Sequence, residues 1–301
     1  MKKQAIEKKD IKNYWENKSP QTWYSDKDQE KNSTSWFNEL AYKRYNVYYE
    51  YLKEIAEFNY HKDEKVLEIG TGVGTDIVSY AKNGSIVSGI DLTENAIDIT
   101  KKHLETFKLS YDKLLVADAE NLPFEDNYFD LVYSFGVLHH TPNTEKGVQE
   151  VLRVLKPGGK FIIMLYSKGW KHYIKRLLIF GLLKGYLFKY GYEKTVNKTT
   201  EVQGNSPLTY VLKKKEIKKI FRDGEEVSIK KYRLGEFFDY APYNTKKLPG
   251  FISNFFYFFG LERLIGENYI IKGFKRNPNK EKSKVKTSVW QVIWDEYKNY
   301  K

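Results

Sequence analysis

The chain contains 301 residues, 41% of them hydrophobic and 30% charged, with a formal net charge of +12. This length and balance suit a soluble globular protein with one large domain and insertions, or one domain and a small appendage. Cysteine is absent, which excludes disulfides, thiolate catalysis and cysteine-ligated metal sites. No apolar stretch approaches the roughly 20 residues that span a bilayer, and the N-terminus has no apolar signal core. We therefore expect a cytoplasmic protein without a transmembrane segment.

The net positive charge comes mostly from lysine, since only seven of the 51 basic residues are arginine. Arginine is the residue favoured for bidentate contacts with phosphates and bases. The charge therefore indicates a solvated lysine surface and makes nucleic acid an unlikely partner.

The first 33 residues are polar but include four large aromatic side chains, Tyr14, Trp15, Trp23 and Tyr24. We expect an arm folded across the surface of the domain, or a lid that closes over cofactor and substrate and excludes water.

Residues 36–59 carry apolar side chains near the helical period, which predicts a helix packed beside a sheet. Arg44 and Tyr45 on this helix could reach the carboxylate of a cofactor. An arginine on the surface of the helix is the simpler expectation.

From residue 64 onward, short apolar runs alternate with amphipathic segments. The pattern predicts strands at 64–69, 85–90, 112–117, 129–135 and 159–166, and helices at 75–83, 94–107 (with Thr93 as N-cap) and 144–155. Such alternation predicts a parallel sheet covered by helices on both faces. Ligands of these sheets bind at the carboxyl ends of the strands, beside the switch point in strand order.

The turn after the first of these strands, residues 70–74, reads Gly-Thr-Gly-Val-Gly, and Glu68 lies two residues before it. Glycines let the backbone turn sharply and approach a ligand closely. Asp91, at the tip of the second strand, could accept both hydroxyls of a ribose. The spacing departs from the G-x-G-x-x-G of dinucleotide sites. The pattern predicts a nucleoside site and disfavours an NAD-linked oxidoreductase.

Later strand ends carry further polar groups. Asp118 follows strand 112–117 and could accept from the exocyclic amine of adenine, or it could merely cap the next turn. His139 and His140 follow strand 129–135. The run Leu-Lys-Pro-Gly-Gly at 155–159 ends a helix and turns into the next strand.

Taken together, residues 64–166 resemble the class I S-adenosylmethionine (SAM) methyltransferases, and most closely their type 11 group of quinone-biosynthesis and other small-molecule methyltransferases. The resemblance rests on Glu68 with its G-x-G-x-G turn, Asp-Ala-Glu-x-Leu-Pro-Phe at 118–124, Val-Leu-His-His at 137–140 and the 155–159 run. It implies a Rossmann-like, doubly wound, mostly parallel seven-stranded α/β sheet. It also implies SAM as cofactor and S-adenosylhomocysteine as product, with Glu68 at the methionine end and Asp91 on the ribose. The implied cofactor-binding residues are Glu68, Gly70, Thr71, Gly72, Gly74, Asp91, Leu92, Asp118, Ala119, Glu120 and Phe135.

The methyl donor of such an enzyme is an activated sulfonium, so alignment and desolvation of the acceptor supply most of the acceleration. A base helps if the acceptor is a hydroxyl or a protonated amine. The catalytic candidates are His139, which we favour, His140 and Tyr166. Alternatively, one histidine caps the following helix and the other packs on the sheet. No metal is expected, because no histidine or acid pattern has a known ligand spacing.

The segment 170–192 is basic and strongly apolar, which predicts an amphipathic helix covering the active site. A peripheral membrane contact, a groove for a lipid-like acceptor and a homodimer contact are the alternatives. Farther on we expect a helix at 213–221, strands at 226–233 and 269–275, an aromatic insertion at 234–268, a lysine-rich linker at 277–288 and a docked helix at 289–297.

These expectations divide the chain into four parts. They are an N-terminal arm and helix at 1–60, a SAM-binding core at 61–166, acceptor-binding insertions with the last strands at 167–276, and a linker with a terminal helix at 277–301.

The leading hypothesis is methyl transfer from SAM to a small molecule through O, N, S or C by in-line displacement. A nucleic-acid methyltransferase is the second hypothesis. Such enzymes carry Asn or Asp, Pro, Pro and an aromatic after the fourth strand, whereas residues 134–137 read Ser-Phe-Gly-Val. A SAM-binding protein without catalysis is the third.

Overall fold

The computed structural model describes residues 7–18, 25, 30–169, 172–201, 204–232 and 268–279. Trp23 and Tyr24, the predicted insertion up to residue 267, and the predicted linker and helix after residue 279 lie outside the described residues.

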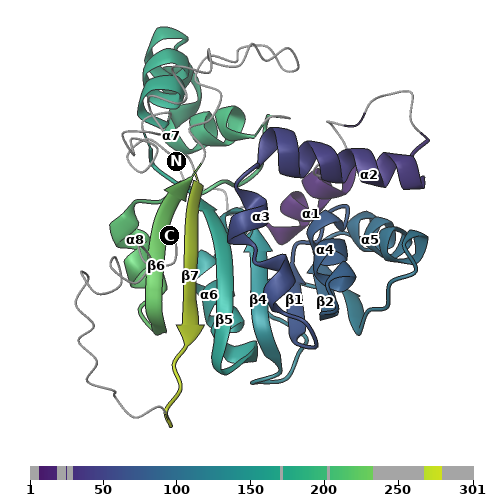
Figure 1. Ribbon diagram of the computed structural model, residues 1–301. Coiled ribbons are helices and arrows are strands. Elements are labelled where there is room, and N and C mark those ends of the chain that lie inside the picture. The colour runs from purple at the N-terminus through teal and green to yellow at the C-terminus, as the bar shows by residue number, and fades with distance from the viewer. Residues whose placement is uncertain are drawn as a thin grey trace, which may run out of the picture.

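A seven-stranded sheet forms the centre of the described part of the chain (Figure 1). Its spatial order is β3-β2-β1-β4-β5-β7-β6, and all neighbours are parallel except those that pair with β7. The chain runs from β1 outward to β3 and then returns through β4 to the other side of β1, which places the switch point between β1 and β4. The strands are β1 (Lys65–Ile69), β2 (Ile86–Asp91), β3 (Lys113–Val116), β4 (Phe129–Phe135), β5 (Leu155–Tyr166), β6 (Gly224–Tyr232) and β7 (Asn268–Lys275). This arrangement confirms the predicted doubly wound fold.

The strand β5 begins earlier than predicted. Leu155 already pairs with Phe129, and the register shifts before the regular pairing resumes at Leu131 and Lys160. Gly158 lies in this irregular stretch with a φ of +80°, so the predicted Pro-Gly-Gly turn is present inside the strand.

The helices of the core follow the prediction closely. α4, α5 and α6 end within one residue of the expected positions, and the Thr93 side chain caps α5 by accepting from the amide of Ala96. The helical segments are α1 (Lys8–Asn17), α2 (Thr34–Lys43), η2 (Arg44–Tyr48), α3 (Leu52–Ile55), η3 (Phe58–Tyr60), α4 (Thr75–Lys82), α5 (Glu94–Thr106), η4 (Leu138–His140), α6 (Thr144–Val154), η5 (His172–Leu183), α7 (Tyr186–Thr200) and α8 (Lys214–Ile220).

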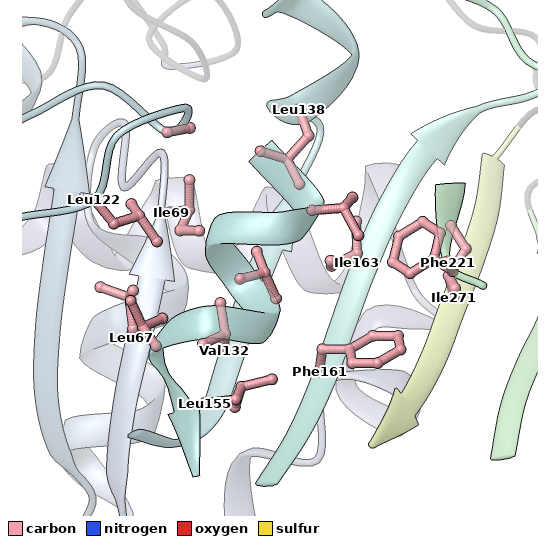
Figure 2. Close-up of a cluster of buried hydrophobic side chains, with 14 of the residues drawn as sticks. Leu67, Ile69, Leu122, Val132, Leu138, Leu155, Phe161, Ile163, Phe221 and Ile271 are labelled. Atoms are coloured by element: carbon pink, nitrogen blue, oxygen red, sulfur yellow. The ribbon is translucent and has the colours of Figure 1, made fainter. Parts of the chain in front are cut away.

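Both faces of the sheet are buried, which explains why the strands read as continuous apolar runs. In β5, Phe161, Ile163 and Leu165 belong to the core on one face, whereas Ile162 and Met164 belong to the core on the other. The first core includes side chains of α6 and α8, and the second includes side chains of α3, α4 and α5. Figure 2 shows side chains of β1, β4, β5 and β7 that meet in the first core. The sheet is therefore a rigid platform whose carboxyl edge carries the candidate site.

The segment predicted as one helix at 36–59 is broken into α2, the π-helical turn η2, α3 and η3. Glu57 has a positive φ of 58° between α3 and η3, and its carboxylate binds Lys160 and Lys272 from neighbouring strands. Burial raises the pKa of Glu57, but the basic groups of His61, Lys160 and Lys272 outweigh it and lower the pKa well below its usual value. Contacts with the sheet, rather than helical periodicity, fix this segment.

The segment predicted as one helix at 170–192 contributes residues to two helices, η5 and α7. Gly185, with a φ of +70°, lies between them. Gly191, with a φ of +75°, kinks α7 as well. Figure 1 shows α7 beyond the edge of the sheet at which β5 ends and β7 begins. No helix in the described ranges has both the length and the apolar character needed to cross a membrane.

Candidate cofactor and acceptor site

The glycine-rich turn at 70–74 connects β1 to α4 at the carboxyl edge of the sheet. Gly70 and Gly74 have φ values of +81° and +77°, which residues other than glycine rarely adopt. A Cβ atom on Gly70 would lie 2.2 Å from Cγ2 of Val137, in the segment that follows β4. The predicted turn is thus held against the end of β4, beside the switch point.

Asp91 ends β2 beside this turn and is fixed by three donors. Its Oδ2 accepts from the amide of Gly72 at 3.1 Å, and its Oδ1 accepts from the hydroxyl and the amide of Thr93 at 2.8 and 3.0 Å. Burial raises the pKa of Asp91, and these hydrogen bonds oppose the rise. A carboxylate has about four acceptor positions, so these three donors leave room for one donor from a ligand, such as a ribose hydroxyl.

Asp118 and Glu120 follow β3 and share Lys8 as an ionic partner. Asp118 also accepts from the amide of Glu120 at 2.9 Å, so it caps its own turn as the simpler interpretation expected. Glu120 is buried and accepts from the amide of Asn143 at 2.6 Å. Since Asn143 caps α6, Glu120 has a structural role, and Asp118 is the better placed of the two to meet a cofactor.

Arg44 is buried, so the expectation of a surface arginine was wrong. Its Nε donates to Asp76 at 2.7 Å and its Nη2 forms an ion pair with the same carboxylate. The hydroxyls of Tyr45 and Tyr133 each donate to Asp76 at 2.8 Å. Arg44 therefore joins η2 to α4 and is committed to Asp76 rather than to a cofactor carboxylate.

Glu68 lies beneath the glycine turn and is 4% exposed. Burial, together with the nearby carboxylate of Asp76, raises the pKa of Glu68 well above its usual value, and Arg44 opposes the rise. Its Oε2 atom has no hydrogen-bond partner among the described residues. A buried acceptor of this kind suits a donor group from a ligand.

The other predicted cofactor residues lie around this centre. Thr71 is buried and accepts from the hydroxyl of Thr100 at 3.0 Å. Leu92 and Ala119 directly follow Asp91 and Asp118, and Phe135 ends β4 with the guanidinium of Arg44 centred 5.0 Å from its ring. The carboxyl edge thus collects the predicted residues from β1 to β4.

His139 and His140 form the short helix η4 after β4, and both are buried. The ring of His139 lies 3.9 Å from the ring of Tyr166, measured between centroids, at the end of the adjacent strand β5. Burial, and secondarily the neighbouring His140, hold the pKa of His139 well below its usual value. His139 is therefore a neutral ring packed on the sheet, as the alternative interpretation had it.

His140 faces a different set of groups. Its Nδ1 lies 2.8 Å from the carbonyl oxygen of Leu208, which fixes the ring, and its Nε2 lies 3.5 Å from Oε1 of Glu201 at the end of α7. The indole ring of Trp15 lies at a centroid distance of 5.0 Å. Segment 204–212 brings Leu208 here, because Tyr210 donates its amide to the carbonyl of His139 at 2.8 Å.

Helix α1 crosses the same edge and touches both halves of the site. Lys8 pairs with Asp118, the hydroxyl of Tyr14 donates to the carbonyl of Gly204 at 2.8 Å, and Trp15 lies on His140. Glu16 accepts from the first two amides of α5, at 3.2 and 3.0 Å. Among the described residues of the arm, α1 folds across the surface of the domain, above the predicted cofactor residues.

Sequence reasoning missed Glu201, Lys8 and Glu16. Each reaches the site from a segment far along the chain, through contacts that no local pattern encodes. The paired aromatics Tyr14 and Trp15 were the one signal that the arm needed a surface to pack on.

Comparison with known proteins matches part of this chain to a protein family. A profile described as "Methyltransferase domain" matches residues 67–163. The chain is 35% identical over 144 residues to phosphoethanolamine N-methyltransferase 2 of Caenorhabditis elegans, which covers 47% of this chain and 33% of that protein. It is 30% identical over 136 residues to a ubiquinone biosynthesis O-methyltransferase of Coxiella burnetii, covering 44% of this chain and 58% of that protein. The chain thus spans between a third and somewhat more than half of these relatives.

Among solved structures, phosphoethanolamine N-methyltransferase 2 of Haemonchus contortus, in complex with phosphomonomethylethanolamine and S-adenosylhomocysteine, has a TM-score of 0.55 and 18% identity. The match covers 89% of this chain and 61% of that one. At this identity the likeness concerns the fold. Residues 67–163, with their glycine turn, their acids at successive strand ends and their strand order, form a domain of the class I SAM-dependent methyltransferase family.

Proposed function

We propose that this protein transfers the methyl group of SAM to a small-molecule acceptor. The observation that carries the proposal is the meeting, at one sheet edge, of two sets of groups. Asp91, Asp118 and the glycine turn lie on one side, and His139, His140 and Tyr166 lie on the other. The first set suits an adenosyl group, and the second suits the nucleophile that must approach its methyl.

The reaction requires little beyond alignment and a place for one proton. The acceptor atom forms a bond to the methyl carbon as the bond from carbon to sulfur breaks, and the sulfonium leaves as a neutral thioether. A hydroxyl or ammonium acceptor also releases a proton. We infer that His140, rather than the initially favoured His139, is the better base. The carbonyl oxygen of Leu208 fixes its Nδ1, and its Nε2 lies 3.5 Å from Oε1 of Glu201, whereas the ring of His139 is packed against Tyr166.

Aromatic side chains surround these histidines, which favours a largely apolar acceptor. Tyr166 packs on His139, and Trp15 and Tyr14 approach from α1. The ubiquinone-biosynthesis and phosphoethanolamine enzymes among the relatives are both named for small molecules. Phenols, amines and thiols with an apolar body are the class that we expect to fit.

The helices η5 and α7 suggest where an apolar acceptor comes from. Leu182, Leu183 and Phe188 are 50%, 74% and 83% exposed, and Lys184 and Lys189 stand among them. Apolar side chains mixed with lysine favour an anionic lipid surface. Co-sedimentation with vesicles should then depend on anionic lipid and fall when Leu183 and Phe188 are both changed to Glu, whereas equal binding by that variant would refute the contact.

Calorimetric titration with SAM, S-adenosylhomocysteine and NAD tests the central proposal. Binding of both adenosyl ligands without NAD should be followed by methyl transfer to members of an acceptor panel. SAM binding without turnover on any acceptor would instead favour a SAM-binding protein without catalysis. No binding of either adenosyl ligand would overturn the proposal.

A further inference from the structure

Three potential metal ligands meet at the acceptor side of the edge. His139 and His140 come from η4, and Glu201 comes from the end of α7. One ligand atom from each lies within 4.8 Å of the other two. The histidines are 0% and 5% exposed, and the Glu201 side chain is 15% exposed. The group is therefore enclosed rather than a chance meeting of surface acids.

The polar atoms of this group are not satisfied by the protein. Neither ring nitrogen of His139 has a hydrogen-bond partner in the part of the chain that the structure describes, and the same holds for Oε1 of Glu201. Buried polar atoms are nearly always paired, so unpaired ones call for a ligand or an ion. Here three such atoms belong to two residues of one cluster.

The hydrogen bonding of His140 shows what kind of partner is missing. Its Nδ1 donates to the carbonyl of Leu208 at 2.8 Å, which leaves a lone pair on Nε2. That lone pair and Oε1 of Glu201 are 3.5 Å apart, without a hydrogen bond between them. Two acceptors that face each other across such a gap can share a cation. A single proton between them would still leave His139 unpaired.

We propose that His139, His140 and Glu201 bind a divalent transition-metal ion, with Zn²⁺ as the best match. Two imidazoles and one carboxylate are a recurrent donor set for such ions. The separation of 3.5 Å between His140 and Glu201 is close to the edge of a coordination tetrahedron, about 3.3 Å for bonds of about 2.0–2.1 Å. The bond from His140 to Leu208 is the outer-shell contact that metal-binding histidines usually make.

Three protein ligands leave at least one coordination position for another group. On the proposed function, which this role presupposes, that position would take the oxygen, nitrogen or sulfur of the acceptor and favour its deprotonated form. The ion would then replace His140 as the group that promotes loss of the proton, because Nε2 of His140 would be a ligand. Binding of the ion itself does not depend on methyl transfer.

Metal binding is testable on the tag-free protein, and the absence of cysteine removes thiolates as competing ligands. We expect one equivalent of Zn²⁺ by calorimetry. We also expect visible ligand-field bands when Co²⁺ replaces Zn²⁺, with intensities typical of four or five ligands. Glu201→Gln, which keeps the shape of the side chain, and His140→Ala should each weaken Co²⁺ binding by about tenfold or more.

The matched control is His61→Gln. His61 is also buried beside two carboxylates, Glu57 and Glu64, but Lys160 and Lys272 already neutralise Glu57. This variant should bind Co²⁺ as the wild type does. Failure of the wild type to bind either ion would overturn the metal site. So would unchanged binding by a folded Glu201→Gln variant, or loss of binding in His61→Gln alone.

Titration of SAM into the same preparations separates the two proposals. Retained SAM binding and turnover without any metal affinity would overturn only the metal site. Stoichiometric Zn²⁺ binding without affinity for SAM would support the metal site and overturn the methyltransferase function.

Discussion

Asp91 offers the sharpest test of where the cofactor lies. If the acceptor position that the protein leaves free on this carboxylate receives a ribose hydroxyl, that hydrogen bond to a charged group contributes about 1.5–3 kcal/mol. Asp91→Ala should then weaken SAM binding by about the same free energy, which is roughly 10- to 150-fold in affinity. Asp91→Asn keeps an uncharged acceptor and should lose roughly half of this stabilisation, or about 3- to 12-fold in affinity.

The Asn variant also creates a conflict that the structure makes explicit. Its amide group must turn a donor toward either the Gly72 amide or the Thr93 donors, all of which now donate to Asp91. The loss should therefore lie nearer the upper end of its range.

Calorimetric titration measures these losses, and Asp112→Asn is the matched control. Asp112 precedes β3 at the opposite edge of the same sheet and accepts only from the side chains of Ser88 and Tyr128 among the hydrogen bonds described for its carboxylate. The control should bind SAM normally. SAM affinity within threefold of wild type in a folded Asp91→Ala protein would refute the placement of the ribose at the end of β2.

Three further predictions concern stability and access. Arg44→Met leaves Asp76 buried without its cation and should destabilise the fold by about 3–5 kcal/mol in urea unfolding. Arg44→Met combined with Asp76→Asn should recover part of that loss, and no recovery would mean that packing rather than charge explains it. Because its basic partners hold the folded-state pKa of Glu57 below the unfolded value, Glu57 supplies stability above about pH 4.5 that is lost as the pH falls. Glu57→Gln should therefore unfold with a lower free energy than the wild type at neutral pH, and this difference should shrink as the pH falls below about 4.5. A difference in unfolding free energy that does not change with pH would contradict the assigned ion pairs. Lys8→Ala frees Asp118 from a partly exposed ion pair worth about 0–1 kcal/mol, so SAM affinity measured by calorimetry should rise by up to about fivefold, whereas a fall would mean that Lys8 itself contacts the cofactor.

The sequence was sufficient where local pattern and tertiary structure agree. The strands from β1 to β5 are apolar, several of the connections between them contain glycine or proline, and Thr93 caps its helix where its chemistry predicted. Positive φ angles at Gly70 and Gly74 follow from the same logic.

Prediction from the sequence failed where contacts between residues far apart in the chain determine the structure. Arg44 reads as a surface residue until the fold brings it to Asp76, a buried carboxylate that also accepts from two tyrosine hydroxyls. The segment expected as one helix at 36–59 is broken, and at its end Glu57 adopts a positive φ and pairs with lysines on β5 and β7. Glu201 has no local signal at all, since only the placement of α7 and of residues 204–212 against η4 brings it to His140.

The placement of α1 has a kinetic consequence. One ten-residue helix contacts Asp118 through Lys8, the start of α5 through Glu16 and His140 through Trp15. A rigid helix cannot leave one of these partners while staying seated on the others, so cofactor exchange and acceptor entry would share a single opening event. Its ionic contacts are partly exposed and individually weak, so this opening should be frequent and faster at high salt.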